Sequence, residues 1–99
     1  MNVFGYNTVT TFWDDFSIAD AYGIRAIKNT YERSFNDWKD DYQYLTELVM
    51  VLNWKLWYHY ENGNEEYARL YNELWKEADM YAMDNLHGNE LSYFIETTD

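Results

Sequence analysis

Large apolar residues recur every three or four positions along most of this chain, and no proline interrupts them. Because an α-helix completes a turn in about 3.6 residues, this spacing gathers the apolar side chains on one face of a helix. Proline is the residue that breaks a helix interior most strongly, so its absence lets helices run long. The sequence therefore predicts an all-α protein: a single domain, built as a small bundle of three long helices with a short N-terminal arm and a short C-terminal segment.

The first predicted helix covers residues 12–40. Thr11 or Ser17 is expected to cap it, with Asp20 three residues after Ser17 in a pattern similar to a capping box. Its inward stripe is expected to consist of Ala19, Tyr22, Gly23, Ala26, Ile27, Tyr31, Phe35 and Trp38. Gly23 lies on this stripe, where it either allows a close helix approach or marks a turn.

The second predicted helix covers residues 41–61 and is apolar around almost its whole circumference. Such a helix is either buried centrally or pressed against a partner. Asp40 or Asp41 is expected to cap its N-terminus, and the Asn62-Gly63 pair is a strong signal for its end.

The third predicted helix covers residues 65–86, with Asn64 as its cap and an inward stripe that runs from Tyr67 to Ala82. Residues 1–11 alternate weakly and are expected to form a loose strand or a docked arm. Residues 90–97 are expected to form a helical turn or an extended arm against the bundle.

Charge limits the class of partner. Eighteen Asp and Glu residues oppose seven Lys and Arg residues, which gives a formal net charge of −11. A surface of this kind repels nucleic acid, itself a polyanion, and attracts basic protein surfaces. A small soluble domain needs a net charge of only about 2–8 in magnitude, so the excess suggests a use toward a partner. The excess is uneven, at −4 for residues 1–50 and −7 for residues 51–99.

Aromatic residues are also abundant, with five Trp, five Phe and eleven Tyr. Acidic disordered tails are poor in aromatics, so the acidity belongs to a folded surface. A domain of this size cannot bury all of these rings, and exposed Tyr and Trp are favoured at protein interfaces.

One acidic stripe follows from helical spacing. Glu66, Glu73, Glu77 and Asp84 share one face of the third predicted helix, at steps of about 10, 6 and 10 Å along its axis. Successive phosphates of a DNA strand lie roughly 6–7 Å apart, so the stripe can imitate part of a phosphate track. Arg69 and Lys76 are expected to dilute it, because Glu65 and Glu66 can pair with Arg69.

No catalytic, cofactor or metal site is expected from the sequence. The chain has no cysteine, and none of its four glycines belongs to a phosphate-binding loop. Asp84 and His87 stand three residues apart, a spacing used in metal sites, but His87 is better interpreted as a contact for helix-end carbonyls. His59 is interpreted as a partly exposed polar edge.

The chain is expected to be soluble and cytoplasmic. Its first eleven residues lack the features of a signal peptide, and its longest apolar run, residues 48–52, is far shorter than the roughly 20 residues that span a bilayer. The absence of cysteine fits a reducing compartment.

Four segments carry a resemblance to a known group of proteins: FWDDFSIADAYGIRAIKNTY (12–31), YLTELVMVLNWKLW (44–57), LYNELWKEADMYA (70–82) and ELSYF (90–94). In their order they resemble a family of small acidic proteins from phages and mobile elements of Gram-positive bacteria. The resemblance carries no catalytic residues. It implies a context that includes anti-restriction and anti-CRISPR inhibitors, several of which occupy nucleic-acid-binding grooves.

The leading hypothesis is a non-enzymatic inhibitor that mimics nucleic acid and binds a basic host defence protein, such as a Cas nuclease or a restriction enzyme. The expected partner-binding residues are Glu66, Glu73, Glu77, Asp84, Asp37, Asp40 and Asp41, and no direct contact with nucleic acid or membrane is expected. The alternative is a structural or adaptor protein that forms a homodimer through the second predicted helix, around Trp54 and Trp57. A small metalloenzyme that uses acidic residues and the two histidines is a third option.

Overall fold

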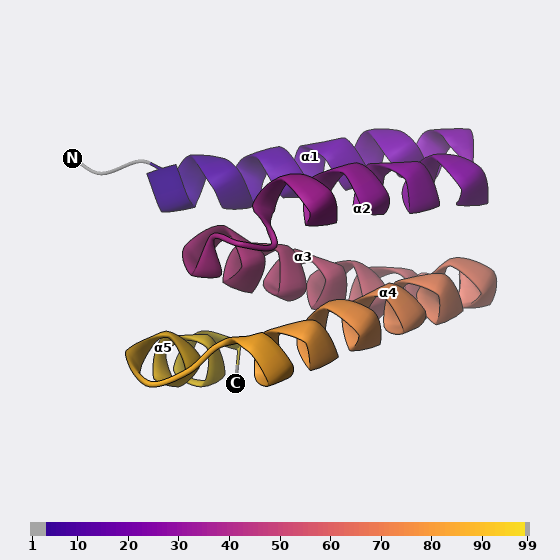
Figure 1. The fold of residues 1–99 in the computed structure, drawn as a ribbon. Helices are drawn as coiled ribbons and strands as arrows, with labels where there is room; N and C mark the ends of the chain where they lie inside the picture. The colour runs from indigo at the N-terminus through magenta and orange to yellow at the C-terminus, as the bar shows by residue number, and fades with distance from the viewer. Residues whose placement is uncertain (1–3, 99) are drawn as a thin grey trace.

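A computed structural model describes the backbone of residues 4–98 and the side chains from Thr11 to Thr98. This part of the chain is all-helical, as predicted, but it contains five helices rather than three (Figure 1). They are α1 (Phe4–Tyr22), α2 (Ile24–Trp38), α3 (Tyr42–Glu61), α4 (Glu65–Asn85) and α5 (Asn89–Thr98).

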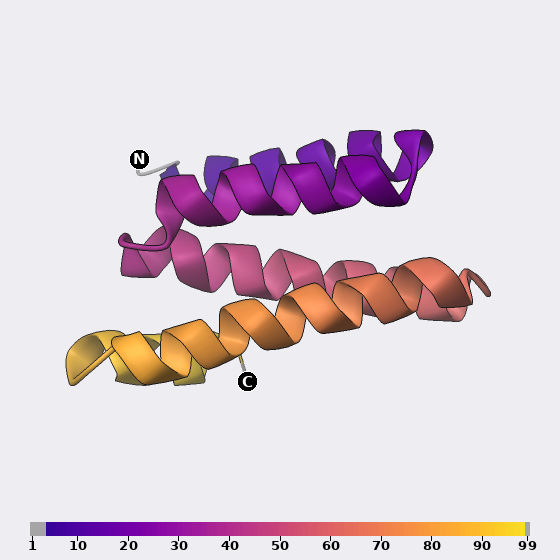
Figure 2. The ribbon, with the colours of Figure 1, turned by 45° about the vertical axis from the view of Figure 1, so that its right-hand side comes forward.

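The helices form two hairpins that pack on each other. Figures 1 and 2 show α1 beside α2 in one layer and α3 beside α4 in the other, with α5 folded back near the start of α3. Helix α3 packs against all four other helices. A helix that is apolar around almost its whole circumference is expected to be either buried centrally or pressed against a partner, and α3 takes the central position.

Gly23 divides the first predicted helix, so the prediction of one helix over residues 12–40 is wrong. Its backbone has φ +111° and ψ −172°, a conformation that only glycine adopts readily. A Cβ at Gly23 would meet nothing within 4 Å, so the residue serves the turn and not a close helix approach. Tyr22, expected to face inward, lies at this turn with 81% of its surface exposed.

The predicted N-terminal arm is also wrong for residues 4–11, which belong to α1; residues 1–3 lie outside the described part. Adding a residue to an existing helix costs far less than starting one, and the segment that follows is anchored in the core through Phe12 and Phe16. Thr11 and Ser17 are consequently interior residues of α1, not caps.

The later boundaries agree closely with the prediction. The Asp41 carboxylate caps α3 and accepts hydrogen bonds from the backbone N–H groups of Gln43 and Tyr44, at 3.1 and 3.2 Å. Gly63, at φ +78°, lies in the turn between α3 and α4. The C-terminal segment, for which a turn and an arm were both open, is the helix α5.

The core lies between the two hairpins and is built largely from the predicted stripes of the helices, joined by Phe16 and Phe94, which belong to none of those stripes. Its fully buried members include Phe16, Ile27, Leu45, Leu48, Val49, Val51, Leu52, Tyr71, Ala78 and Phe94. Within the described residues, none of the helices has the length and apolar character needed to cross a membrane.

Gly23→Ala is expected to lower the free energy of unfolding by about 1–3 kcal/mol, because alanine is strained at this φ and ψ. Gly63→Ala is the matched control, since Gly63 also has a positive φ, in the left-handed region that alanine tolerates better. Urea denaturation followed by circular dichroism measures both. An equal or smaller loss for Gly23→Ala would contradict the role given to this turn.

Candidate functional site

The predicted acidic stripe lies on α4, and all four of its residues, Glu66, Glu73, Glu77 and Asp84, are exposed. The stripe borders α2 rather than standing apart from it. The Tyr31 hydroxyl on α2 donates a hydrogen bond of 3.1 Å to Glu77. Burial and the Glu77 carboxylate raise the pKa of the Tyr31 hydroxyl well above its ordinary value.

Two shallow hollows follow the seam between α2 and α4. One, of about 290 Å³, is lined by Lys28, Tyr31, Glu32, Leu70, Glu73, Leu74 and Glu77. The other, of about 170 Å³, is lined by Ile24, Lys28, Glu66, Arg69, Leu70 and Glu73. The structure thus brings Glu66, Glu73 and Glu77 to one seam, whereas Asp84 lies farther along α4 and lines neither hollow.

The three remaining predicted contact residues lie at the other end of α2. Asp37 is exposed on the last turn of α2, and Asp40 is exposed in the connection to α3. This connection lies toward the end of the bundle where α4 also finishes (Figure 1). Asp41 is exposed too, but one of its carboxylate oxygens is occupied by the α3 cap.

Ion pairs are scarce on this surface. Among the residues that the structure describes, the only ion pair between an acid and a lysine or arginine joins Asp20 to Lys55, and Asp20 also accepts a hydrogen bond from His59. The expected pairing of Arg69 with Glu65 and Glu66 is therefore not formed. The exposed carboxylates of the described surface therefore have no ion-pair partner within the described chain.

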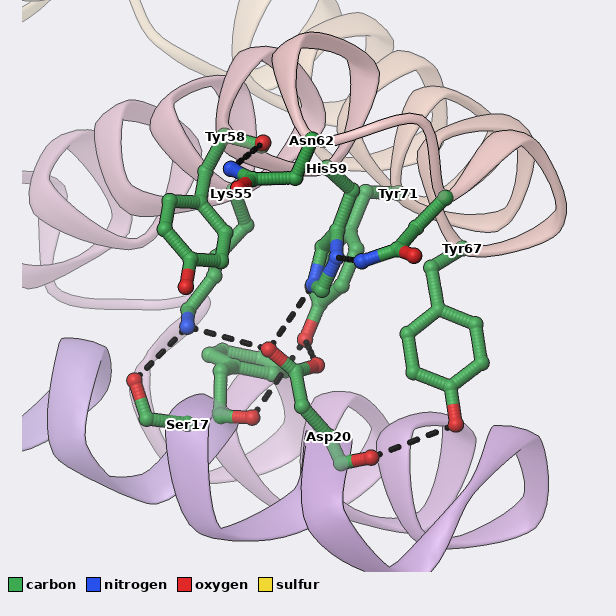
Figure 3. A network of polar contacts seen from close by, with 10 residues as sticks. Ser17, Asp20, Lys55, Tyr58, His59, Asn62, Tyr67 and Tyr71 are labelled. Carbon is green, nitrogen blue, oxygen red and sulfur yellow. Dashed lines mark hydrogen bonds and ion pairs between the residues drawn. The ribbon is translucent and has the colours of Figure 1, made fainter.

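A buried polar network that the sequence analysis missed joins α1 to α3 and α4 (Figure 3). At its centre, Asp20 Oδ2 accepts hydrogen bonds from Lys55 Nζ at 3.0 Å and from His59 Nε2 at 2.8 Å. Asp20 Oδ1 accepts one from the Tyr71 hydroxyl at 2.5 Å, and the Asp20 carbonyl oxygen accepts one from the Tyr67 hydroxyl at 3.2 Å. Burial and the Asp20 carboxylate raise the pKa of the Tyr71 hydroxyl far above its ordinary value.

The network fixes the tautomer of His59. The Asp20 carboxylate only accepts hydrogen bonds, so His59 Nε2 carries the proton. On the other side of the ring, Asn64 Nδ2 lies 3.1 Å from His59 Nδ1 and donates to it. Asn64 occupies the predicted cap position of α4, but its side chain makes no capping hydrogen bond there.

Lys55 is held by polar and aromatic groups together. Its ammonium donates to Ser17 Oγ at 2.6 Å as well as to Asp20, and it lies 4.1 Å from the Trp13 ring centroid and 5.2 Å from that of Tyr58. Only 2% of the Lys55 surface is exposed. Cation–π attraction adds to the ion pair in such a desolvated place.

The interpretation of His59 as an exposed edge is wrong, since only 3% of its surface is exposed. Helical spacing carries the missed signal: Lys55 lies three residues after Leu52, and His59 four residues after Lys55. Both polar residues therefore continue the buried stripe of α3.

This network holds α1, α3 and α4 together through hydrogen bonds between their side chains. The contact between Ser17 and Lys55 has the geometry of a nucleophile and a base, but a base must be neutral and Lys55 is paired with a carboxylate. A hollow of about 420 Å³ opens beside the network, between Trp13, Tyr58 and Tyr67. The polar side chains at its floor, Asp20, Lys55 and His59, already bond to one another.

Large aromatic side chains gather on the exposed surface of α3. Trp54, Trp57 and Tyr58 have 43%, 54% and 47% of their surfaces exposed. Tyr60 is more exposed still and meets Trp57 edge to face, with ring centroids 5.5 Å apart. The aromatic residues on which the dimer hypothesis depends are thus accessible.

The two residues considered for a metal, Asp84 and His87, are both exposed. Within the described residues, no three His, Asp or Glu side chains are grouped so that they could hold a metal ion.

Comparisons with protein-family models, with curated proteins and with solved structures found no significant match for this chain.

Glu47→Gln is expected to stabilise the fold above pH 7 by about 1–3 kcal/mol and to leave it unchanged near pH 4. Glu47 is buried, its Oε2 has no hydrogen-bond partner in the described structure, and burial, with Asp41 nearby, raises its pKa from 4.5 to about 7. The unfolded chain therefore ionises before the folded one, and stability falls as pH rises from 4.5 to 7. Thermal unfolding from pH 4 to pH 8 measures the effect, with Glu61→Gln as an exposed control on the same helix. A gain that does not depend on pH would contradict this account.

Asp20→Asn is expected to lower the free energy of unfolding by about 3–5 kcal/mol, because it leaves the buried Lys55 ammonium without a counter-charge. Lys55→Met removes that charge, so the double variant Asp20→Asn/Lys55→Met should be more stable than the sum of the two single losses implies. Urea denaturation gives the free energy of unfolding of all three variants and of the original protein, which together form a double-mutant cycle. Additive losses would show that the two residues do not depend on each other.

Proposed function

We propose that this protein is a non-enzymatic inhibitor that occupies the basic, nucleic-acid-binding surface of a host defence protein, a nuclease in the first instance. The observation that carries the proposal is the set of exposed α4 carboxylates, which outnumber the neighbouring bases and form no ion pair within the described chain. Phosphates in a nucleic acid present charge to a protein in the same way, from one side and without internal compensation.

Spacing on a regular helix supports the mimicry. Helix α4 runs without a break from Glu65 to Asn85, so Glu66, Glu73 and Glu77 keep their intervals of about 10 and 6 Å along its axis. The Tyr31 hydrogen bond holds Glu77 in place from α2. A partly fixed carboxylate loses less side-chain freedom on binding than a free one, which favours complex formation.

A net charge of −11 acts before contact is made. Long-range attraction speeds the encounter with a basic surface, and the effect falls as salt screens the charges. An inhibitor must reach the groove before the nucleic acid does, so a fast encounter serves this function directly.

The test compares two variants of equal charge. Glu66→Gln/Glu73→Gln/Asp84→Asn alters the stripe and leaves Glu77 with its hydrogen bond to Tyr31. Asp14→Asn/Glu90→Gln/Glu96→Gln removes three exposed acids elsewhere, and both variants change the net charge from −11 to −8.

The stripe variant is expected to inhibit a purified Cas nuclease or restriction enzyme at least about tenfold less well, as three partly desolvated contacts imply, and the control variant within about twofold of the original. Cleavage assays and calorimetric titration, with and without nucleic acid, measure this. An equal loss of inhibition in both variants would show that the stripe contributes only through the net charge of the protein. Absence of binding to any such nuclease would show that the proposed function is wrong.

A further inference from the structure

Basic residues are confined to one side of the molecule. Six of the seven, Arg25, Lys28, Arg33, Lys39, Arg69 and Lys76, belong to α2, its C-cap and α4. The seventh, Lys55, is buried and paired with Asp20. Figures 1 and 2 show α2 and α4 toward one side of the bundle and α1 and α3 toward the other. In the described structure, the helices α1 and α3 of that side themselves therefore expose acids but no base, and Arg69 of α4 meets α3 at a hollow that Leu56 and Tyr60 also line.

An aromatic surface lies on this side. Trp54, Trp57, Tyr58 and Glu61 occupy positions i, i+3, i+4 and i+7 of α3, so they share one helix face, which we call the α3 aromatic face. All four are exposed. Two tryptophans with about half of their surfaces in solvent are unusual in a small domain, because burial of such a ring contributes strongly to stability.

The chemistry of this face favours a cation. The faces of aromatic rings carry partial negative charge and attract ammonium and guanidinium groups, with tryptophan the strongest. The chain already uses this attraction on its inner side, where the Lys55 ammonium lies 5.2 Å from the Tyr58 ring centroid. No exposed base of the described α1 or α3 competes for the rings, and Glu61 adds a carboxylate beside them.

We propose that the α3 aromatic face binds an arginine-rich segment of a partner protein. A guanidinium group stacks on an indole ring and at the same time pairs with a carboxylate, a combination that lysine reproduces poorly. Charge argues against a second copy of this chain as the occupant, because two chains of net charge −11 would meet with Glu61 on each side. The inference rests on the proposed function in that it gives the same basic partner a second contact.

The test uses a synthetic ten-residue peptide of alternating arginine and glycine, with two matched peptides that carry lysine or uncharged citrulline in place of arginine. Calorimetric titration gives affinities, and NMR of the tryptophan indole N–H groups locates the contact. The variant Trp54→Leu/Trp57→Leu removes the rings and keeps an apolar surface, and Tyr22→Leu alters an aromatic residue on α1 that is 81% exposed.

We expect the arginine peptide to bind more tightly than both matched peptides. We also expect Trp54→Leu/Trp57→Leu to weaken it about tenfold, as the loss of two exposed cation–π contacts implies, and Tyr22→Leu to leave it within about twofold. Equal affinity for the arginine and lysine peptides, or equal affinity of the double variant, would overturn the inference. Sedimentation that shows a dimer dissolved by Trp54→Leu/Trp57→Leu would also overturn it, since a second copy would then cover this face.

Failure of this inference is separable from failure of the proposed function. Trp54→Leu/Trp57→Leu reports on the aromatic face through the peptides, which need no nuclease. The stripe variant reports on nuclease inhibition and should keep its preference for arginine over lysine. Loss of that preference in the stripe variant, with the double variant unaffected, would place the peptide on α4 and overturn the inference.

Discussion

The fold depends on one carboxylate that is shared by three helices. Asp20 on α1 accepts hydrogen bonds from Lys55 and His59 on α3 and from Tyr71 on α4. Apolar packing alone is not directional and tolerates sliding of one hairpin over the other. A buried ammonium without its counter-charge is strongly destabilising, so only the alignment that brings Asp20 to Lys55 is allowed. The turn at Gly23, three residues later, then carries α2 along the α4 side of the bundle.

This interior arrangement also shapes the outer surface. Lys55 is the only base between Lys39 and Arg69, and its charge is used inside the protein. Helix α3 therefore supplies no exposed cation of its own beside its aromatic rings and Glu61. Arg69 of α4 reaches this surface only at Leu56 and Tyr60, while the other bases of α2 and α4 stand near the acids of the seam. The two surfaces therefore differ in charge pattern. The seam between α2 and α4 is mixed but predominantly acidic, with apolar residues among its lining, whereas the α3 aromatic face carries Glu61 and no base of its own.

Periodicity predicts most of the fold, because it reports which face of each helix is buried. Together with the Asn62-Gly63 stop signal, it places the bounds of α3 and α4 to within one residue, and the cap of α3 is Asp41, one of the two candidates Asp40 and Asp41. It fails at Gly23, since a glycine on an apolar stripe fits both a helix and a turn, and only packing of the hairpin decides between them. It marks Lys55 and His59 as positions on the buried stripe of α3, but it does not show that Asp20 is their partner. Their burial depends on partners that lie 35 to 51 positions away in the sequence.

Under the proposed function, the position of the two surfaces bears on the shape of the basic site that this protein would occupy. A basic patch that is open to solvent can contact only one side of a small bundle. Such a patch would bind either the α4 stripe or the α3 aromatic face. A channel that encloses nucleic acid has basic walls on several sides, and stacking aromatic groups with charge suits such walls, which hold bases and phosphates together. A predominantly acidic seam on one side and aromatic rings with acids on the other would therefore suit an enclosed channel better than an open patch, should the proposed function hold.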